Sequence, residues 1–561
     1  MNEHLAALAR RVWDTALEAS PTSATMLGDH RFDDRVEDFS REQEDRLIGL
    51  LDGFKAEAAA IDPAGLDTND RITRRSLVFE ASSHADRLRN RMAELAVDPM
   101  LGIHMEIVNS VPQLVPTDAE QADALVTKAS RVGGMFDQSI ERLRQGVANR
   151  RTPTAILVEK SLAQIDDYLA APLAEDPFLQ IRPPSDMDAA ATEAWRDRMR
   201  VQVEEVVRPA FARYRTMVAG EVLPAARPQE KAGVCWLPDG EEVYARAVRA
   251  YTSLDLDPRA VHQSGLEDIA ALADEYREMA SGVLGTADIS AIYDRLRNDP
   301  ALRFTTAEAV EEHASRALAR ADAAVPGWFG RLPKAPCVVR RMPDVGAADA
   351  TIAFYLPPAQ DGSRPGTFFI NVSQPTTRTR YESEALAFHE SVPGHHLQIA
   401  IAQELEDIPL FRRHATATAF IEGWGLYTER LADEMGLYSG EVERMGMLSF
   451  DSWRAGRLVV DTGLHALGWS RQQAIDYLLG NSPQAPNNVV NEVDRYIGYV
   501  GQALAYKIGQ REIFRLRSEA QRSMGSRFDI KGFHDTVLGA GAVPLDLLGD
   551  LVSEWASAAR R

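Results

Sequence analysis

Amphipathic helical periodicity runs through most of the 561-residue sequence and restricts its fold more than any other feature. Apolar residues recur every three or four positions between charged ones, which places them on one side of an α-helix. The pattern is clearest at residues 41–60, 118–146, 190–219 and 259–283, and Pro, Gly and Asp clusters interrupt it at 172–188 and 221–240. No short-period repeat or long low-complexity linker divides the chain. The sequence therefore predicts one mostly helical body.

Residues 334–373 depart from the helical pattern. They contain β-rich runs at 336–341, 351–356 and 367–372, and the turn-rich segment PPAQDGSRPG (357–366) joins the last two. We expect a β-hairpin or small sheet just before the helix that carries His389. Its exposed edge could pair with an extended peptide substrate, and a purely structural hairpin that covers the helices is equally compatible with the pattern.

Composition excludes several classes of partner and site. The net charge of −21 argues against nucleic acid and against anionic membranes, which both need a basic face. The two cysteines, Cys235 and Cys337, are too few and too far apart in sequence for a cysteine-rich zinc site or a disulfide framework. The N-terminal segment shows no signal-peptide pattern, and no stretch is as apolar as a membrane span. We therefore expect a soluble cytoplasmic protein.

Three of the twelve histidines, His389, His395 and His396, lie within the segment HESVPGHH. In the HExxH zinc motif, two histidines one helical turn apart bind the metal and the glutamate polarises a water molecule. His389 and Glu390 begin such a motif, but position 393 is proline. The segment therefore predicts a zinc site only if the helix is distorted.

A straight helix cannot deliver two ligands from this segment. His396 would lie about 10.5 Å further along the axis than His389, too far for one zinc with bonds of about 2.1 Å to nitrogen. His395 would point about 120° away. Pro393 removes a backbone donor and Gly394 permits unusual dihedral angles, so we expect a kink or bulge here. It would act as a two-residue insertion that makes His395 the second ligand, with His396 as a competitor for that role.

The third ligand is predicted on the following helical segment. Ala415, Ala419 and Gly423 recur at every fourth position and form a stripe of small residues that lets another helix approach closely. Glu422 lies beside this stripe and is the predicted third ligand. Glu429, two turns further on, is the second choice.

Roles around one zinc ion follow from these ligands. A zinc-bound water has a lowered pKa, and Glu390 is the natural general base that moves its proton to the leaving amine. The oxyanion of the intermediate needs a donor, for which Tyr496, Tyr499 and Tyr506 are candidates. Each of these tyrosines is also compatible with a packing role in which its hydroxyl finds a structural partner.

Polar residues near the C-terminus are predicted to bind substrate. Gln502, Tyr506 and Lys507, together with Tyr499, could hold the C-terminal carboxylate of a peptide, although a solvated helix surface is a competing interpretation. That would make the enzyme a metallocarboxypeptidase or dipeptidyl carboxypeptidase.

A second polar stripe lies in an otherwise apolar helical segment. Arg457, Asp461 and His465 recur at four-residue spacing, and polar residues in such a helix need partners. They could support the zinc ligands, and His465 could reach the transition state as a catalytic residue. A structural ion-pair network is at least as compatible with the pattern.

Six motifs spread over most of the chain point to a known family. They are WLPDGEEVY (236–244), DGSRPG (361–366), HESVPGHHLQ (389–398), EGWGLY (422–427), RLVVDTGLHALGWSR (457–471) and RYIGYVGQALAYKIG (495–509). This ordered set resembles the bacterial family called domain of unknown function 885 (DUF885), which itself resembles the helical zinc carboxypeptidases of the Taq type and, distantly, angiotensin-converting enzyme. Several members of the family look like lipoproteins, whereas this sequence shows no export signal.

The resemblance implies a single gluzincin-like helical domain over residues 1–561, with a deep active-site groove. Residues 1–330 would form the framework and 331–561 the catalytic part, and a homodimer is expected by analogy with the Taq-type enzymes. The pair Arg495-Tyr496 resembles one in the converting-enzyme group, which favours Tyr496 as the oxyanion donor. The predicted function is a zinc-dependent peptide hydrolase, and the alternatives are a catalytically silent peptide-binding scaffold or a zinc hydrolase of a non-peptide amide.

Overall fold

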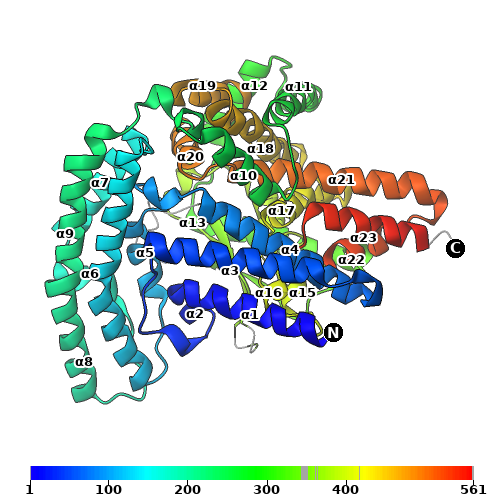
Figure 1. Ribbon diagram of the computed structural model, residues 1–561. Coiled ribbons are helices and arrows are strands. Elements are labelled where there is room, and N and C mark those ends of the chain that lie inside the picture. Colours follow the sequence, from blue (N-terminus) through cyan, green and yellow to red (C-terminus); the bar gives the residue numbers. More distant parts are fainter. Residues whose placement is uncertain (1, 343–351, 360–361, 363, 416, 559–561) are drawn as a thin grey trace.

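The computed structural model describes residues 2–342, 352–359, 362, 364–415 and 417–558 and is mostly helical (Figure 1). The N-terminal helices are α1 (Glu3–Ala19), α2 (Pro21–Met26), α3 (Arg41–Ala60), α4 (Thr68–Arg89) and α5 (Ile103–Ser110). Helices α1, α3 and α4 lie side by side, and Leu8, Phe54 and Leu77 belong to their shared core. This layer of helices forms one face of the molecule.

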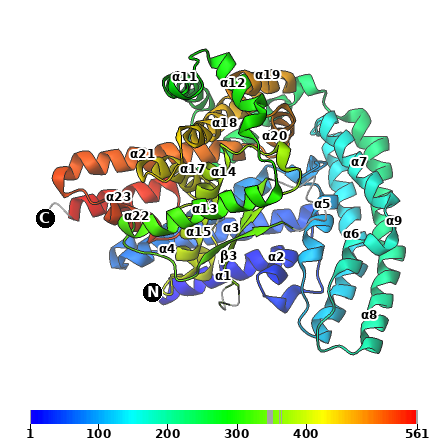
Figure 2. The ribbon, with the colours of Figure 1, turned by 180° about the vertical axis from the view of Figure 1, so that it is seen from behind.

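A second group of long helices lies along one side of the molecule (Figures 1 and 2). It consists of α6 (Ala119–Ala148), α7 (Ala155–Ala170), α8 (Ala189–Gln202) and α9 (Arg208–Met217). π-Helical turns at Val203–Val207 and Val218–Val222 continue α8 and α9. Each turn is followed by a proline, Pro209 or Pro224, whose ring would clash with the carbonyl four residues earlier in a regular helix. The first widened turn therefore lets the helix continue through Pro209, whereas the helix ends in a 3-10 turn that contains Pro224.

The helices expected from periodicity are confirmed. Residues 41–60 coincide with α3, 118–146 fall on α6, and 190–219 form the continuous α8–α9 helix. The fourth segment, 259–283, falls on α11 (Pro258–Val283). In sequence, α11 follows α10 (Gly240–Thr252) and precedes α12 (Ile289–Asn298) and α13 (Ala307–Ala324). Loops and short 3-10 turns occupy much of the predicted breaks.

A three-stranded sheet precedes the histidine segment, as expected. Its strands are β1 (Cys337–Arg341), β2 (Ala353–Leu356) and β3 (Gly366–Ile370), in the order β1-β3-β2. β2 and β3 form the predicted antiparallel hairpin, with Tyr355 opposite Phe368, whereas β1 runs parallel to β3. Residue 351 of the second predicted run and residues 360, 361 and 363 of the connection lie outside the described residues. The sheet packs against α13 through β1 and against α14 (Ser383–Glu390) through β2 (Figure 2).

The C-terminal helices include one, α18 (Glu441–His465), that packs both against α11 and against other helices of this part. They are α14 (Ser383–Glu390), α15 (His395–Gln403), α16 (Leu410–Arg413), α17 (Thr418–Glu434), α18 (Glu441–His465), α19 (Arg471–Asn481), α20 (Pro486–Gly498), α21 (Ala505–Met524), α22 (Ile530–Leu538) and α23 (Leu545–Ala558). Every residue of α18 from Met445 to His465 is buried, which is typical of a helix at the centre of a large protein. Its polar side chains must therefore be satisfied by neighbouring helices.

The predicted stripe of small residues lies where α17 crosses α21. A Cβ atom on Gly423 would overlap the Cα of Gly509, and one on Gly509 would overlap the carbonyl oxygen of Ala419. Ala415 does not belong to this crossing, because α17 begins only at Thr418. None of the helices in the described parts of the chain is long and apolar enough to cross a membrane.

Candidate metal centre

The HESVPGHH segment breaks into two helices instead of forming one bent helix. α14 ends at Glu390 and α15 begins at His395. Ser391 and Gly394 leave the helical region, with ψ angles of −114° and −128°, and the Val392–Pro393 peptide is cis. A Cβ atom on Gly394 would overlap the carbonyl oxygens of Phe388 and His389, so this position requires glycine. The expected distortion is confirmed, and it is larger than a kink.

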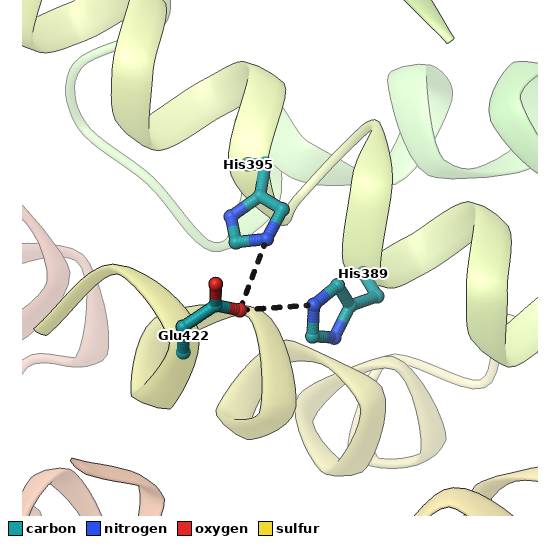
Figure 3. Close-up of side chains that lie close together, drawn as sticks. All are labelled: His389, His395 and Glu422. Atoms are coloured by element: carbon teal, nitrogen blue, oxygen red, sulfur yellow. Dashed lines mark ion pairs between the residues drawn. The ribbon is translucent and has the colours of Figure 1, made fainter. Parts of the chain in front are cut away.

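This break brings His395 next to His389 and Glu422 (Figure 3). Glu422 Oε2 lies 3.8 Å from His389 Nε2 and 3.6 Å from His395 Nε2, and one potential ligand atom from each residue lies within 4.8 Å of the others. Bonds of about 2.1 Å in a tetrahedral site place ligand atoms about 3.4 Å apart, close to the observed spacing. Among the described residues, no other cluster of His, Cys, Asp and Glu has this geometry. The donor set therefore fits a zinc ion.

Glu429 orients His389. Its Oε1 accepts a hydrogen bond from His389 Nδ1 at 2.8 Å, which leaves Nε2 free to face Glu422. Burial alone would lower the pKa of His389, but Glu422 and Glu429 raise it to about 9. Glu429, the second choice for the third ligand, therefore binds the other ring nitrogen of His389. The sequence analysis missed this orienting role, which the spacing of Glu422 and Glu429 on the same helix could have suggested.

His396 faces away from this cluster. Its Nε2 donates to the carbonyl oxygen of Ala335 at 3.0 Å, and its Nδ1 accepts from the Tyr355 hydroxyl at 2.9 Å. Burial lowers its pKa to about 4. The structure therefore brings His395, and not its competitor His396, to Glu422, while His396 ties α15 to the sheet.

Glu390, the predicted general base, is the last residue of α14 and directly follows His389. Its side chain is half-buried. Its negative charge also raises the pKa of His389, although less than the hydrogen bonds to Glu422 and Glu429 do. No hydrogen bond within the described chain engages its carboxylate. A carboxylate beside the cluster and free of structural partners suits proton transfer.

The hydroxyl of Tyr496 is occupied by a structural network. It accepts hydrogen bonds from Arg457 Nε at 2.8 Å and Trp453 Nε1 at 3.0 Å, and it donates to Glu492 Oε2 at 2.8 Å. Its proton is therefore directed at Glu492.

Tyr506 is the tyrosine that the structure associates with the cluster. Burial raises its pKa, and the charge of Glu422 raises it further. Tyr506 lies one turn before Gly509, where α21 crosses α17 beside Glu422. Tyr499 instead packs edge-on against Tyr251, with ring centroids 5.5 Å apart.

The other predicted polar residues have partners of their own. Lys507 forms a buried ion pair with Asp451, and Gln502 Oε1 accepts from Arg495 Nη1 at 3.1 Å. His465 bonds only backbone groups among the described residues, because its Nδ1 accepts from Val234 N and its Nε2 donates to the carbonyl of Tyr496. Burial lowers the pKa of His465 to about 4. These contacts favour the structural interpretation of His465.

Asp461 connects α18 to two other elements. It accepts from the Tyr244 hydroxyl at 2.7 Å and from Gly501 N at 3.2 Å. Arg457 and His465, its neighbours on the predicted stripe, bond the Tyr496 hydroxyl and the Tyr496 carbonyl. The stripe thus anchors the segment around α20 and the turn that follows it.

Arg454 is a buried arginine without a hydrogen-bond partner among the described residues, and the sequence analysis did not single it out. It lies one turn before Arg457 on the buried face of α18. The signal was available, because two arginines three residues apart in an otherwise apolar helix are rare without a partner.

Comparison with known proteins agrees with the fold. A solved structure described as a putative lipoprotein from Colwellia psychrerythraea matches with a TM-score of 0.92 at 25% identity, covering 99% of each chain. A second, described as a putative lipoprotein of unknown function from Shewanella oneidensis, matches with a TM-score of 0.76 at 18% identity, covering 98% of this chain and 99% of that one. No curated protein matches the sequence.

One family covers nearly the whole chain. The sequence pattern of the bacterial proteins of unknown function called DUF885 matches residues 21–552. The matched region contains every motif from which the family was expected, including both halves of the broken HESVPGHH segment and the helix of Glu422. The chain therefore belongs to the DUF885 family.

Proposed function

We propose that this protein is a zinc-dependent peptide hydrolase whose metal is held by His389, His395 and Glu422. The observation that carries the proposal is the convergence of these three side chains across a helix break. The two carboxylates that face His389, the half-buried Glu422 and the buried Glu429, add to the case, because they favour a cation there. The likeness to helical zinc carboxypeptidases, expected from the motifs, belongs to the same proposal.

The chain's own residues supply the remaining chemistry. A zinc ion at this site provides a water of lowered pKa and polarises the scissile carbonyl. Glu390 takes the proton of the attacking water and delivers it to the leaving amine. Tyr506, near Glu422, donates its hydroxyl to the oxyanion, a role that the sequence had favoured for Tyr496.

Metal analysis of purified variants tests the site. We expect about one zinc per chain, as a single tetrahedral site requires, in the wild type and in His396→Ala. We expect none in His389→Ala, His395→Ala or Glu422→Gln. Melting temperatures establish that each variant is folded. Zinc that persists in the three ligand variants, or is absent from the wild type, contradicts the assignment.

Hydrolysis of a mixed peptide library tests the chemistry. Glu390→Gln should retain zinc and lose about 10²- to 10⁴-fold in rate, the usual contribution of a general base. A zinc-loaded wild type that cleaves no peptide contradicts the proposed function. Cleavage of non-peptide amides in the same assay would identify the alternative zinc hydrolase.

A further inference from the structure

Three arginines gather around Tyr506, of which Arg454 and Arg457 are buried and Arg495 is half-buried. Arg454 and Arg457 project from α18, and Arg495 from α20. The guanidinium of Arg457 lies 4.4 Å from the centre of the Tyr506 ring, and that of Arg454 lies 5.8 Å from it. Tyr506 in turn lies within the influence of the Glu422 charge. Arg454 and Arg457 therefore both contact the residue on which the charge of Glu422 acts.

Glu492 is the carboxylate that neutralises this group. It accepts from Arg457 Nη2 at 2.9 Å and from Arg495 Nη2 at 3.0 Å. Within the described residues, Arg454 has neither a salt bridge nor a hydrogen bond. It stacks on Phe450 and Trp453, with its guanidinium 4.6 and 4.2 Å from the ring centres. Two of the three cations are thus paired, and both with the same carboxylate.

Several guanidinium nitrogens are buried without a partner. They are Nε and Nη1 of Arg454, Nη1 of Arg457 and Nε of Arg495. Burial and the neighbouring Arg457 lower the pKa of Arg454, although the charges of Glu429 and Glu492 partly offset this shift. Arg454 is only 6% exposed, so water cannot fully replace the missing hydrogen bonds. Such a group is destabilising unless an anion completes it.

We infer that Arg454 and Arg457 bind a carboxylate of the peptide substrate, which makes the enzyme selective for peptides that carry one near the scissile bond. This inference rests on the proposed function. A guanidinium presents paired N–H donors that match a carboxylate, and such charge-assisted bonds are strong where water is excluded. Lys507, the cation predicted for this role, is already neutralised by Asp451. The free C-terminus of a peptide provides the required group, and so does an acidic side chain.

Calorimetric titration of the zinc-loaded Glu390→Gln variant tests the inference without turnover. Three matched pentapeptide sets are compared: free C-terminal carboxylates without acidic residues, the same peptides as C-terminal amides, and those amides with one glutamate. We expect the free carboxylates to bind at least tenfold more tightly than the amides. Restored binding of the third set would show that a side-chain carboxylate also serves, and its absence would assign the site to the C-terminus.

Adding Arg454→Met to this variant should reduce the difference between carboxylate and amide to within about twofold. Arg454 has no hydrogen bond or salt bridge to lose, and methionine can keep the contacts with Phe450 and Trp453, so the melting temperature should not fall. The matched control is Arg511→Met, which removes a surface arginine of α21 that pairs with Asp268 at 2.9 Å and should leave the difference intact. A lowered melting temperature with unchanged selectivity would show that Arg454 is structural.

Equal affinity for carboxylates and amides in the protein with Arg454 intact would overturn the inference and leave the metal site untouched. Failure of the proposed function alone gives a different result. If the wild type holds no zinc and cleaves nothing, but the Glu390→Gln protein still selects carboxylates through Arg454, the proposed function is wrong and the anion site stands. Absence of binding by all three peptide sets would contradict both.

Discussion

At the scale of single residues, Glu429 controls how well His389 can act as a ligand. We predict that Glu429→Gln lowers zinc affinity about 10- to 100-fold, as loss of a carboxylate behind a metal-bound histidine usually does. The amide can still accept from Nδ1, but the buried negative charge is lost, and with it the electrostatic support that this carboxylate gives His389. Competition with a chelator measures the affinity.

The control for this change is Glu434→Gln on the same helix, which loses only a surface pair with Arg517 and should bind zinc normally. Equal affinity in both variants would mean that Glu429 does not tune the centre.

The residues of the metal cluster were predictable because their spacing is local. His389, His395 and Glu422 lie close together in sequence, on α14, α15 and α17, and zinc geometry alone required a break at Pro393 and Gly394. The role of Tyr496 was not predictable in the same way. Its partners Arg457 and Trp453 come from another helix, 39 and 43 residues away in sequence, and no periodicity reveals such a contact.

At the scale of elements, α17 approaches its neighbours closely enough that single methyl groups matter. A Cβ atom on Gly425 would lie 2.7 Å from Cε1 and 2.8 Å from Nε2 of His389. We predict that Gly425→Ala displaces this imidazole and abolishes stoichiometric zinc binding, while a folded helical protein remains by circular dichroism.

Gly134→Ala in α6 is the matched control, because nothing lies within 4 Å of its added methyl group. Alanine is also the better helix former by about 1 kcal/mol, so this variant should be at least as stable as the wild type. Normal zinc content in Gly425→Ala would show that His389 is not held by this contact.

The same distinction between local and distant information applies to the sheet. The β2–β3 hairpin follows from two β-rich runs and a short turn-rich connection. The parallel pairing of β1 with β3 does not, because it joins Val339 to Phe368 across a long segment, and sequence pattern does not specify such a partner. The helices were easier to locate, because each carries its own period along the chain.

At the scale of the whole molecule, one hydrophobic core joins the two predicted parts of the chain. It includes Ile72 and Tyr244 from residues 1–330 as well as Phe388 and Trp424 from residues 331–561. The N-terminal helices therefore support the metal helices directly. The cytoplasmic location and the homodimer stay predictions.

A cavity of about 440 Å³ lies between the N-terminal helices and the end of α20, and its lining includes Glu106, Arg142 and Tyr499. Burial and the nearby charge of Glu37 raise the pKa of Glu106 to about 7, from an ordinary value of 4.5. Because this pKa is raised in the folded state, the protonated form stabilises the fold. That contribution is complete below about pH 4.5 and is lost as the pH rises through about 7.

We therefore predict that Glu106→Gln melts about 1 to 3 °C above the wild type at pH 8, a small shift because the protein is large. The difference should shrink steadily below pH 7 and vanish near pH 4.5, where the wild-type side chain is also neutral. Melting temperatures across this range measure it, and Glu193→Gln on the exposed face of α8 should show no such trend. A difference independent of pH would mean that Glu106 titrates normally and that the cavity does not exclude water from it.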